Sequence, residues 1–422
     1  MHNFFLKEII DKLIHPTGMA KKYNIFISHS SQDKDFCDLL HKRLTQAGFH
    51  VWYDESSLVA NTSLNSDLPK HISECESLLV VLSKNSCKSR WVEEEYNYAK
   101  NLMYQGELNI IPIVIDDCEL PGFYNNYKWI DCKDGLTGKS FFHILSSYYG
   151  ASENLRGMVD VYVSYSWRKE ERELVDAVFN RLKRKQYRIV GDATDQTSYD
   201  NDDRIRRIMK TCCGFIGIVP YREGSNTSRY ILDEIKKAEE CSLPGLLFAD
   251  SRVEDLEEIT NYPIVKIDSS TAVNENTIKD GITLFSPAKP QTPHVFYATE
   301  LDEDREFTNS LICNITGFIV ALPCILGEEV NRGNLQQQIV DRIRSAYVMI
   351  ADISNKNGRY NTCIEAGIAR GADRDLYLVA QGERHTPPFM FRDMNVRYYD
   401  TEVELMAIVH KILRPYRRKI IG

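Results

Sequence analysis

Three glutamates recur in one spacing pattern, and a carboxylate in such a place can do chemistry on a sugar bond. The three sets are Trp91, Glu95 and Ala99; Tyr230, Glu234 and Ala238; and Asn361, Glu365 and Ala369. Positions four apart share one face of a helix, so each glutamate stacks between a ring or amide and a small residue. A single such glutamate is typical of a solvated helix face. Three in register indicate either a repeated active-site position or a structural residue copied by duplication.

The leaving group decides how much help such a carboxylate needs. A carboxylate beside an anomeric carbon stabilises an oxocarbenium-like transition state or attacks the carbon. Nicotinamide leaves NAD as a neutral base, so one well-placed carboxylate is sufficient. A purine or pyrimidine leaves as an anion unless it is protonated, so a second acidic group helps. The third set adds such a group, Asp352, at the end of a strand-like run.

The elements that must position these glutamates also recur. An apolar run that leads into a polar loop occurs at residues 23–27, 160–163 and 294–297, and the loop residues Ser28, Ser164 and Thr299 are 136 and 135 positions apart. A second apolar run precedes each glutamate (78–83, 215–220 and 347–352), and a third follows it (110–115, 246–249 and 376–380). Apolar strands that alternate with helices predict parallel α/β sheets covered on both faces.

The predicted fold class is therefore α/β, with three tandem flavodoxin-like or Rossmann-like units. Ligands of such sheets bind beyond the carboxyl ends of the strands, so each glutamate is expected near the first loop of its own unit. The predicted boundaries are an amphipathic helix at 1–18 and units at 19–150, 158–270 and 291–422. The apolar positions of the first segment favour a helix that docks on its own domain or mediates self-assembly.

The composition of the chain argues against several classes of protein. The chain has 422 residues, of which 43% are hydrophobic and 27% charged, as in folded proteins. Its net charge of −8 argues against a nucleic-acid binder. No apolar stretch approaches the roughly 20 residues of a membrane span. The eleven cysteines lack the spacing of a disulfide framework or zinc site, so we expect a cytoplasmic protein with no metal and no cofactor.

The first unit resembles a TIR (Toll/interleukin-1 receptor) domain of the bacterial type. The resemblance rests on residues 25–34 (IFISHSSQDK), 48–54 (GFHVWYD), 72–83 and 89–95 (SRWVEEE). It implies an enzyme that cleaves or cyclises NAD, or a protein-interaction module, with self-association through TIR domains. Glu95 falls on the family's catalytic glutamate. The substrate-binding positions that the resemblance implies are Ser28, His29, Ser30, Trp52, Asp54 and Trp91.

The second unit resembles a diverged TIR domain through residues 163–166 (VSYS) and 228–234 (SRYILDE). Glu234 is its candidate catalytic residue. The stretch 192–203 is acidic and would repel the diphosphate of NAD, which favours a structural or regulatory role over catalysis.

The third unit is similar to nucleoside 2-deoxyribosyltransferases through residues 295–298 (VFYA), 351–354 (ADIS) and 361–369 (NTCIEAGIA). The resemblance implies that Glu365 is the nucleophile and Asp352 the strand-end acid, with Tyr297 and Asn361 as substrate-binding residues. A domain that senses a nucleotide without turnover is the alternative.

These features lead to three hypotheses. The first is an intracellular TIR enzyme that cleaves the nicotinamide–ribose bond of NAD, in bacterial defence against phage or in nucleotide signalling. The second is a nucleoside or nucleotide N-glycosidase or transferase run by the third unit. The third is a TIR scaffold that senses a nucleotide without catalysis. The expected partners are NAD or a related nucleotide and further copies of the chain, with no nucleic acid and no membrane.

Overall fold

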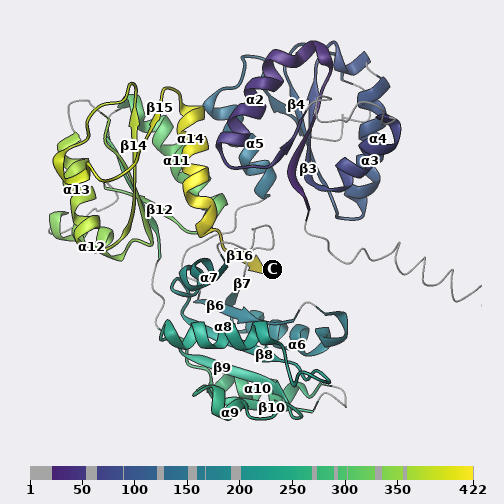
Figure 1. The fold of residues 1–422 in the computed structure, drawn as a ribbon, viewed down its shortest axis with the longest axis vertical. Coiled ribbons are helices and arrows are strands. Elements are labelled where there is room, and N and C mark those ends of the chain that lie inside the picture. The colour runs from purple at the N-terminus through teal and green to yellow at the C-terminus, as the bar shows by residue number, and fades with distance from the viewer. Residues whose placement is uncertain are drawn as a thin grey trace, which may run out of the picture. The chain divides into compact units, whose positions relative to one another are not determined.

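The computed structural model describes residues 21–53, 64–88, 90–120, 128–150, 159–166, 168–191, 201–268, 273–288, 293–301, 303–327, 335–354 and 359–421. The helix predicted at 1–18 and the candidate Asp54 lie outside these residues. By its contacts the chain divides into two compact units, Met1–Tyr148 and Tyr149–Gly422. They are described separately below (Figure 1).

The first unit is built on a five-stranded parallel sheet with the order β2-β1-β3-β4-β5. Its strands are β1 (Tyr23–Ser28), β2 (Val51–Trp52), β3 (Cys75–Leu82), β4 (Asn109–Val114) and β5 (Ile130–Asp131). Its helices are η1 (Ser31–Asp33), α2 (Lys34–Gln46), α3 (Leu64–Ser73), η3 (Ser86–Lys88), α4 (Arg90–Tyr104) and α5 (Gly138–Tyr149). This strand order is the flavodoxin-like one, and it confirms the predicted parallel α/β class.

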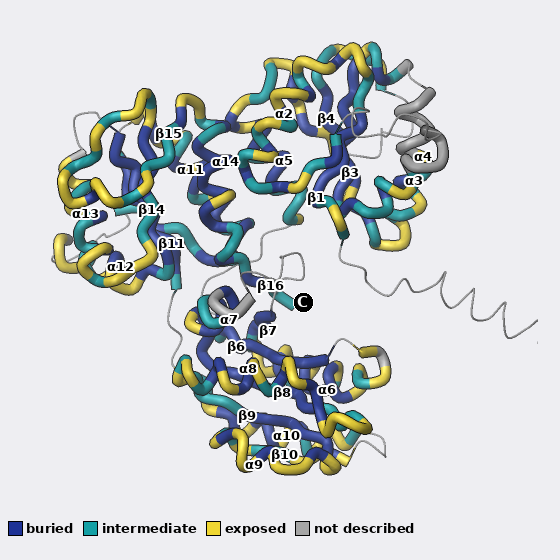
Figure 2. Tube along the Cα trace, viewed as in Figure 1, coloured by how far each residue is buried: buried dark blue, intermediate teal, exposed yellow. Residues whose placement is uncertain are grey.

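The central strands of this sheet are apolar along their whole length because helices cover both faces. Figure 2 shows them buried beneath partly exposed helices. One face packs the side chains of Phe26, Leu78 and Val80 against Ala99 of α4. The order of the sheet reverses between β1 and β3, and in sheets of this kind ligands bind at the carboxyl edge beside such a reversal.

The second unit contains two further sheets, which we call the second and third lobes. The second lobe has five parallel strands with the order β7-β6-β8-β9-β10. They are β6 (Val159–Ser164), β7 (Tyr187–Gly191), β8 (Gly214–Val219), β9 (Gly245–Asp250) and β10 (Ile264–Ile267). Its helices are η5 (Lys169–Glu171), α6 (Arg172–Arg184), α7 (Asn201–Met209), α8 (Arg229–Glu240), α9 (Leu256–Ile259) and α10 (Glu275–Leu284).

The third lobe has five parallel strands with the order β12-β11-β13-β14-β15. They are β11 (Val295–Ala298), β12 (Cys324–Leu326), β13 (Val348–Asp352), β14 (Asp375–Gln381) and β15 (Val396–Tyr399). Its helices are α11 (Glu303–Val320), α12 (Leu335–Ser345), α13 (Arg359–Gly371), η7 (Phe389–Phe391), α14 (Glu402–Leu413) and η8 (Arg414–Tyr416). All three sheets therefore repeat one strand order.

Two features mark the ends of the second and third lobes. Ile278, Ile282 and Phe285 of the α10 region belong to the hydrophobic core of the second lobe. The last strand, β16 (Lys419–Ile421), follows the third lobe in sequence but pairs antiparallel with β7 of the second lobe. The sheet of the second lobe is therefore mixed rather than purely parallel.

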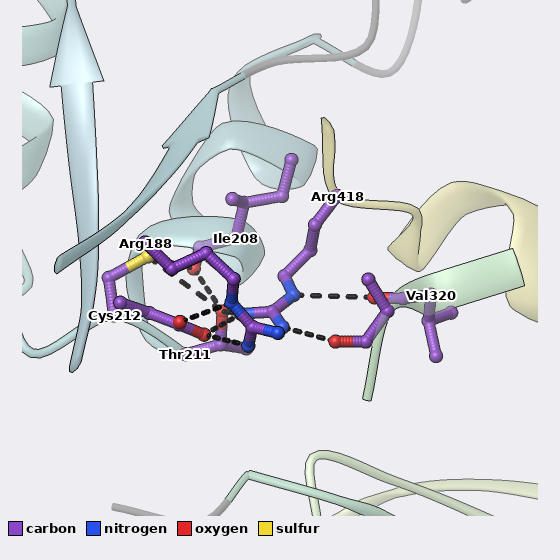
Figure 3. Close-up of polar contacts among 8 residues, drawn as sticks. Arg188, Ile208, Thr211, Cys212, Val320 and Arg418 are labelled. Carbon is purple, nitrogen blue, oxygen red and sulfur yellow. Dashed lines mark hydrogen bonds and ion pairs between the residues drawn. The ribbon is translucent and has the colours of Figure 1, made fainter. Parts of the chain in front are cut away.

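Arg418 holds this C-terminal strand in place (Figure 3). Its buried guanidinium donates to Asp160 Oδ2 at 2.6 Å and Thr211 Oγ1 at 3.2 Å in the second lobe. On the other side it donates to the carbonyl oxygens of Val320, at 3.3 Å, and Ala321, at the end of α11. One side chain thus contacts both lobes, in addition to the pairing of β16 with β7.

Candidate active site

The loop after β1 carries three of the predicted substrate-binding residues. Ser28 is the last residue of β1 and is buried. His29 and Ser30 follow it and are half-buried, and the Ser30 hydroxyl accepts a hydrogen bond from the Gln32 backbone at 3.4 Å, which caps η1. The structure thus places all three at the carboxyl edge of the sheet, where a ligand of this fold binds.

Asp33, to which the sequence assigned no role, ties this loop to the loop after β3. Its carboxylate accepts hydrogen bonds from the Ser83 hydroxyl at 2.5 Å and the Asn85 side chain at 2.8 Å. Bonds to a carboxylate are stronger than bonds between neutral groups. The two loops that flank the point of strand reversal are therefore held in one arrangement by a buried anion.

Two neighbouring rings on β2 and just after it play different parts. Trp52 is only 8% exposed, and its ring stacks on Phe26 and His71 in the core. Tyr53, which the sequence did not single out, packs its ring against His29 at 5.0 Å and donates its hydroxyl to Asp38 at 2.5 Å. Trp52 is therefore a core residue, whereas Tyr53 is the ring that packs against the loop after β1.

Glu95 lies in α4, the helix that follows β3. Ala99, four residues later, is fully buried in the core. Position 95 lies one helical turn before Ala99, nearer the start of α4. At 1.5 Å per residue it is about 7.5 Å from the start of the helix at Arg90. The side chains of Glu95 and Trp91, like the whole of Asp54, lie outside the described residues.

A sequence profile for the TIR domain family matches residues 25–145, a range that includes the loop residues and the position of Glu95 described above. Residues 25–145 form a TIR domain.

Several curated relatives are similar to this segment. It is 35% identical over 97 residues to the probable 2' cyclic ADP-D-ribose synthase TcpO of Methanobrevibacter olleyae, covering 23% of this chain and 28% of that protein. It is 37% identical over 95 residues to the NAD(+) hydrolase PdTIR of Paracoccus denitrificans, covering 22% of this chain and 32% of that protein. It is 36% identical over 97 residues to the 2' cyclic ADP-D-ribose synthase BtTIR of Bacteroides thetaiotaomicron, covering 22% of this chain and 33% of that protein. The match therefore spans about a third of each relative.

Glu234, the candidate glutamate of the second lobe, is buried in the protein interior. Glu234, on α8, is 1% exposed and accepts a hydrogen bond from the hydroxyl of Tyr162, on β6, at 2.5 Å. At the carboxyl edge, Arg222 binds Glu171 through two hydrogen bonds, at 3.0 and 3.2 Å, and also donates to Ser166. This ion pair joins η5, which follows β6, to the loop after β8. Glu234 is therefore buried and hydrogen-bonded to a strand of its own sheet.

The third lobe gathers a denser polar cluster at its carboxyl edge. Asp352 ends β13 and is buried. One of its oxygens accepts from Arg305 at 2.6 Å and from the Tyr399 hydroxyl at 2.5 Å, and the other accepts from Ser354. Although burial opposes the Arg305 charge, the Asp352 carboxylate keeps the pKa of that guanidinium above its ordinary value. Asp352 is thus a hydrogen-bond acceptor that positions Arg305 and Tyr399, two residues that the sequence did not reveal.

The third lobe contains two further candidate residues, Tyr297 near this cluster and Glu365 on α13. The Tyr297 hydroxyl is buried and has no hydrogen-bond partner among the described residues, and burial raises its pKa. Glu365 is half-buried on α13, and burial raises the pKa of its carboxyl to about 7. Its Oε1 lies 3.3 Å from where a side chain on Gly327 would begin, so glycine leaves this approach open. Asn361, in contrast, is exposed.

Across the described residues, no three histidine, cysteine, aspartate or glutamate side chains gather as metal ligands would. None of the described helices is long and apolar enough to cross a membrane.

Proposed function

We propose that the TIR domain cleaves the nicotinamide–ribose bond of NAD, with Glu95 stabilising the ribosyl cation. The observation that carries this proposal is the family match over residues 25–145, together with relatives named as NAD(+) hydrolases and cyclic ADP-D-ribose synthases. The position of residue 95 in α4 supports it, since this position lies one helical turn before the buried Ala99.

The chemistry requires little from the protein beyond position and charge. The ring nitrogen of nicotinamide is already cationic in NAD, so the base leaves neutral and needs no proton donor. A carboxylate near the anomeric carbon offsets the positive charge that develops on the ribose as the bond breaks. Water then captures the cation to give ADP-ribose, or a hydroxyl of the same molecule captures it to give a cyclic product.

The test is nicotinamide release from NAD by the purified full chain, with and without a crowding agent and candidate nucleotides. Glu95→Gln keeps the size of the residue but removes the charge, and we expect it to lower release at least about a hundredfold. Glu94→Gln is the matched control, because position 94 is on the same helix but off the face shared with Ala99. Equal release by the Glu95 variant, or no release by the wild-type chain under all these conditions, would refute the proposal. Chromatography of the products separates hydrolysis from cyclisation.

We also propose that this activity serves bacterial defence against phage, through depletion of NAD or a nucleotide signal made from it. The resemblance of the first unit to bacterial TIR proteins supports this role. The test is phage challenge of cells that express the wild-type chain or its Glu95→Gln variant. Equal plaque counts on the two strains would contradict it.

The third lobe supports a second candidate function, an N-glycosidase or transferase acting on nucleosides or nucleotides. The supporting observation is Glu365, whose pKa near 7 suits both proton transfer and nucleophilic attack. Tyr297, on β11 of the same lobe, offers a buried hydroxyl as a second polar group. Base release from nucleoside monophosphates that persists in Glu95→Gln and disappears in Glu365→Gln is the expected result. Ligand binding with no product in either assay would instead favour a nucleotide-sensing scaffold.

A further inference from the structure

Two cysteines of the third lobe lie unusually close together. The sulfur atoms of Cys313, on α11, and Cys324, the first residue of β12, are 2.9 Å apart. Both residues are partly exposed, so small reagents reach them. A disulfide has a sulfur–sulfur distance of about 2.0 Å, so the pair needs a movement of about 1 Å to form the bond. Movement of this size is within the freedom of an edge strand such as β12.

The backbone between the two thiols keeps them facing each other. They bracket the turn from α11 into β12, which contains Ala321 in the left-handed region with φ of 53°. Arg418 donates to the carbonyl oxygens of Val320 and Ala321 within this turn. Backbone pairing of Cys324 with Val295 of β11 fixes the register of the strand. The thiol pair is therefore part of an ordered corner and not of a loose loop.

We propose that Cys313 and Cys324 form a redox-sensitive site that closes to a disulfide when the cell encounters a peroxide. In the first step one thiolate attacks the peroxide, becomes a sulfenic acid and releases hydroxide. In the second step the other thiolate attacks that sulfur, forms the disulfide and releases a second hydroxide. The two thiols lose two electrons and the peroxide gains them. A cellular dithiol reverses the reaction by thiol–disulfide exchange.

The other cysteines are poorer candidates. Cys37, Cys75 and Cys212 are buried, and burial raises the pKa of each thiol to about 12, which disfavours the reactive thiolate. Cys87 and Cys118 of the TIR domain contact each other, but burial raises the pKa of both thiols. This second pair is a control within the same chain.

The bond would join two elements that lead to the candidate residues of the third lobe. Gly327 follows directly after β12, and a side chain there would begin 3.3 Å from Glu365 Oε1. Arg305, which binds Asp352, stands eight residues before Cys313 on α11, about two helical turns away. The oxidised form would hold both elements in one arrangement, so the pair links the redox state of the cell to the geometry of this cluster.

The experiment treats the reduced full chain with hydrogen peroxide, blocks remaining thiols with N-ethylmaleimide and maps the peptides by mass spectrometry. Trypsin leaves both cysteines on one peptide, residues 306–332, because no lysine or arginine lies between them. The expected result is that this peptide loses two hydrogens and takes up no N-ethylmaleimide. Chymotryptic cleavage after Phe318 should leave its halves joined until a dithiol is added. Cys87 and Cys118 should remain open to alkylation under the same conditions.

Variants and a second measurement complete the test. Cys324→Ser should leave Cys313 as a sulfenic acid that a dimedone probe captures, whereas Cys363→Ser, at a partly exposed cysteine on α13, should leave the disulfide intact. Hydrogen exchange over residues 320–327 should slow on oxidation of the wild-type chain. Two results with the peroxide-treated wild-type protein would overturn the proposal. One is alkylation of both Cys313 and Cys324. The other is separation of the two halves of peptide 306–332 after cleavage at Phe318 without a dithiol.

Discussion

The Arg418 anchor allows a quantitative test of how the two lobes are joined. The perturbation is Arg418→Met, which keeps an apolar stem but removes the guanidinium. Asp160, its ionic partner, is also bound by Arg188 through two hydrogen bonds, at 2.7 and 2.8 Å. The buried cluster therefore has two positive charges and one negative charge. One nitrogen of Arg188, Nη1, has no partner among the described residues, as expected where cations outnumber anions.

The magnitude follows from what each substitution leaves behind. Removing one partner of a buried ion pair costs about 3–5 kcal/mol when the survivor is left uncompensated. Arg418→Met leaves Asp160 paired with Arg188, so the loss is mainly that of the hydrogen bonds, about 3 kcal/mol. Asp160→Asn leaves two buried guanidiniums without an anion and should cost about 4 kcal/mol or more. The double variant lacks Arg418, so only one buried guanidinium remains without an anion. Its loss of stability should therefore be about 2 kcal/mol smaller than the sum of the losses in the two single variants.

The assay is hydrogen exchange of the full chain, read on peptides that contain β7 and β16, because it reports the free energy of local opening. Urea unfolding of the same proteins gives the global values. Arg172→Met is a suitable control, since Arg172 forms an exposed pair with Asp176 and should cost less than about 1 kcal/mol. Additivity of the Asp160 and Arg418 substitutions within about 0.5 kcal/mol would refute the reasoning, because it would mean that the two charges do not interact.

Three further predictions concern the candidate sites. Because burial raises the pKa of Glu365 from 4.5 to about 7, its folded state prefers the protonated form, so stability should fall by about 2–3 kcal/mol between pH 4.5 and 7. Glu365→Gln should abolish this part of the pH dependence in urea unfolding. Tyr162→Phe should cost about 2 kcal/mol, because it removes the hydroxyl bound to buried Glu234, while NAD cleavage stays unchanged. Asp33→Ala should destabilise the TIR domain by about 2 kcal/mol and raise the KM for NAD, because Ser83 and the first loop lose their anchor.

Each of these has its own control. Glu306→Gln, at an exposed carboxylate on α11, should leave the pH profile of stability as it is in the wild type. If Tyr162→Phe lowered NAD cleavage as much as Glu95→Gln, Glu234 would have a part in catalysis that its burial does not indicate. For Asp33, a variant with wild-type stability and KM would show that the bonds to the loop after β3 do not position the site.

Much of the fold could be predicted because its signals are local. A buried parallel strand needs an apolar residue at nearly every position, so runs such as 78–82 and 215–219 identify strands without reference to the rest of the chain. The helices that carry Glu95, Glu234 and Glu365 are likewise visible from their own periodicity. The match to the TIR family confirms the assignment of the first unit.

The candidate sites could be predicted only in part. The loop residues Ser28 and His29 lie at the carboxyl edge, as the strand pattern indicated. Asp33 and Arg305 were missed, because their roles depend on partners about 50 residues away in sequence. Nothing in the local pattern of a carboxylate or a guanidinium shows which distant group it meets.

The sequence alone determined the repeated strand–helix alternation, the position of each glutamate on its helix and the kinship of the first unit, since all three depend on neighbouring residues. The tertiary structure decided how those glutamates differ. Glu234 is held by Tyr162 in the core, whereas Glu365 stands half-buried with its charge opposed by burial alone. It also decided that the last strand joins another sheet through Arg418. The physical reason is that burial and ion pairing depend on which surfaces meet in space, and one spacing pattern is compatible with several such environments.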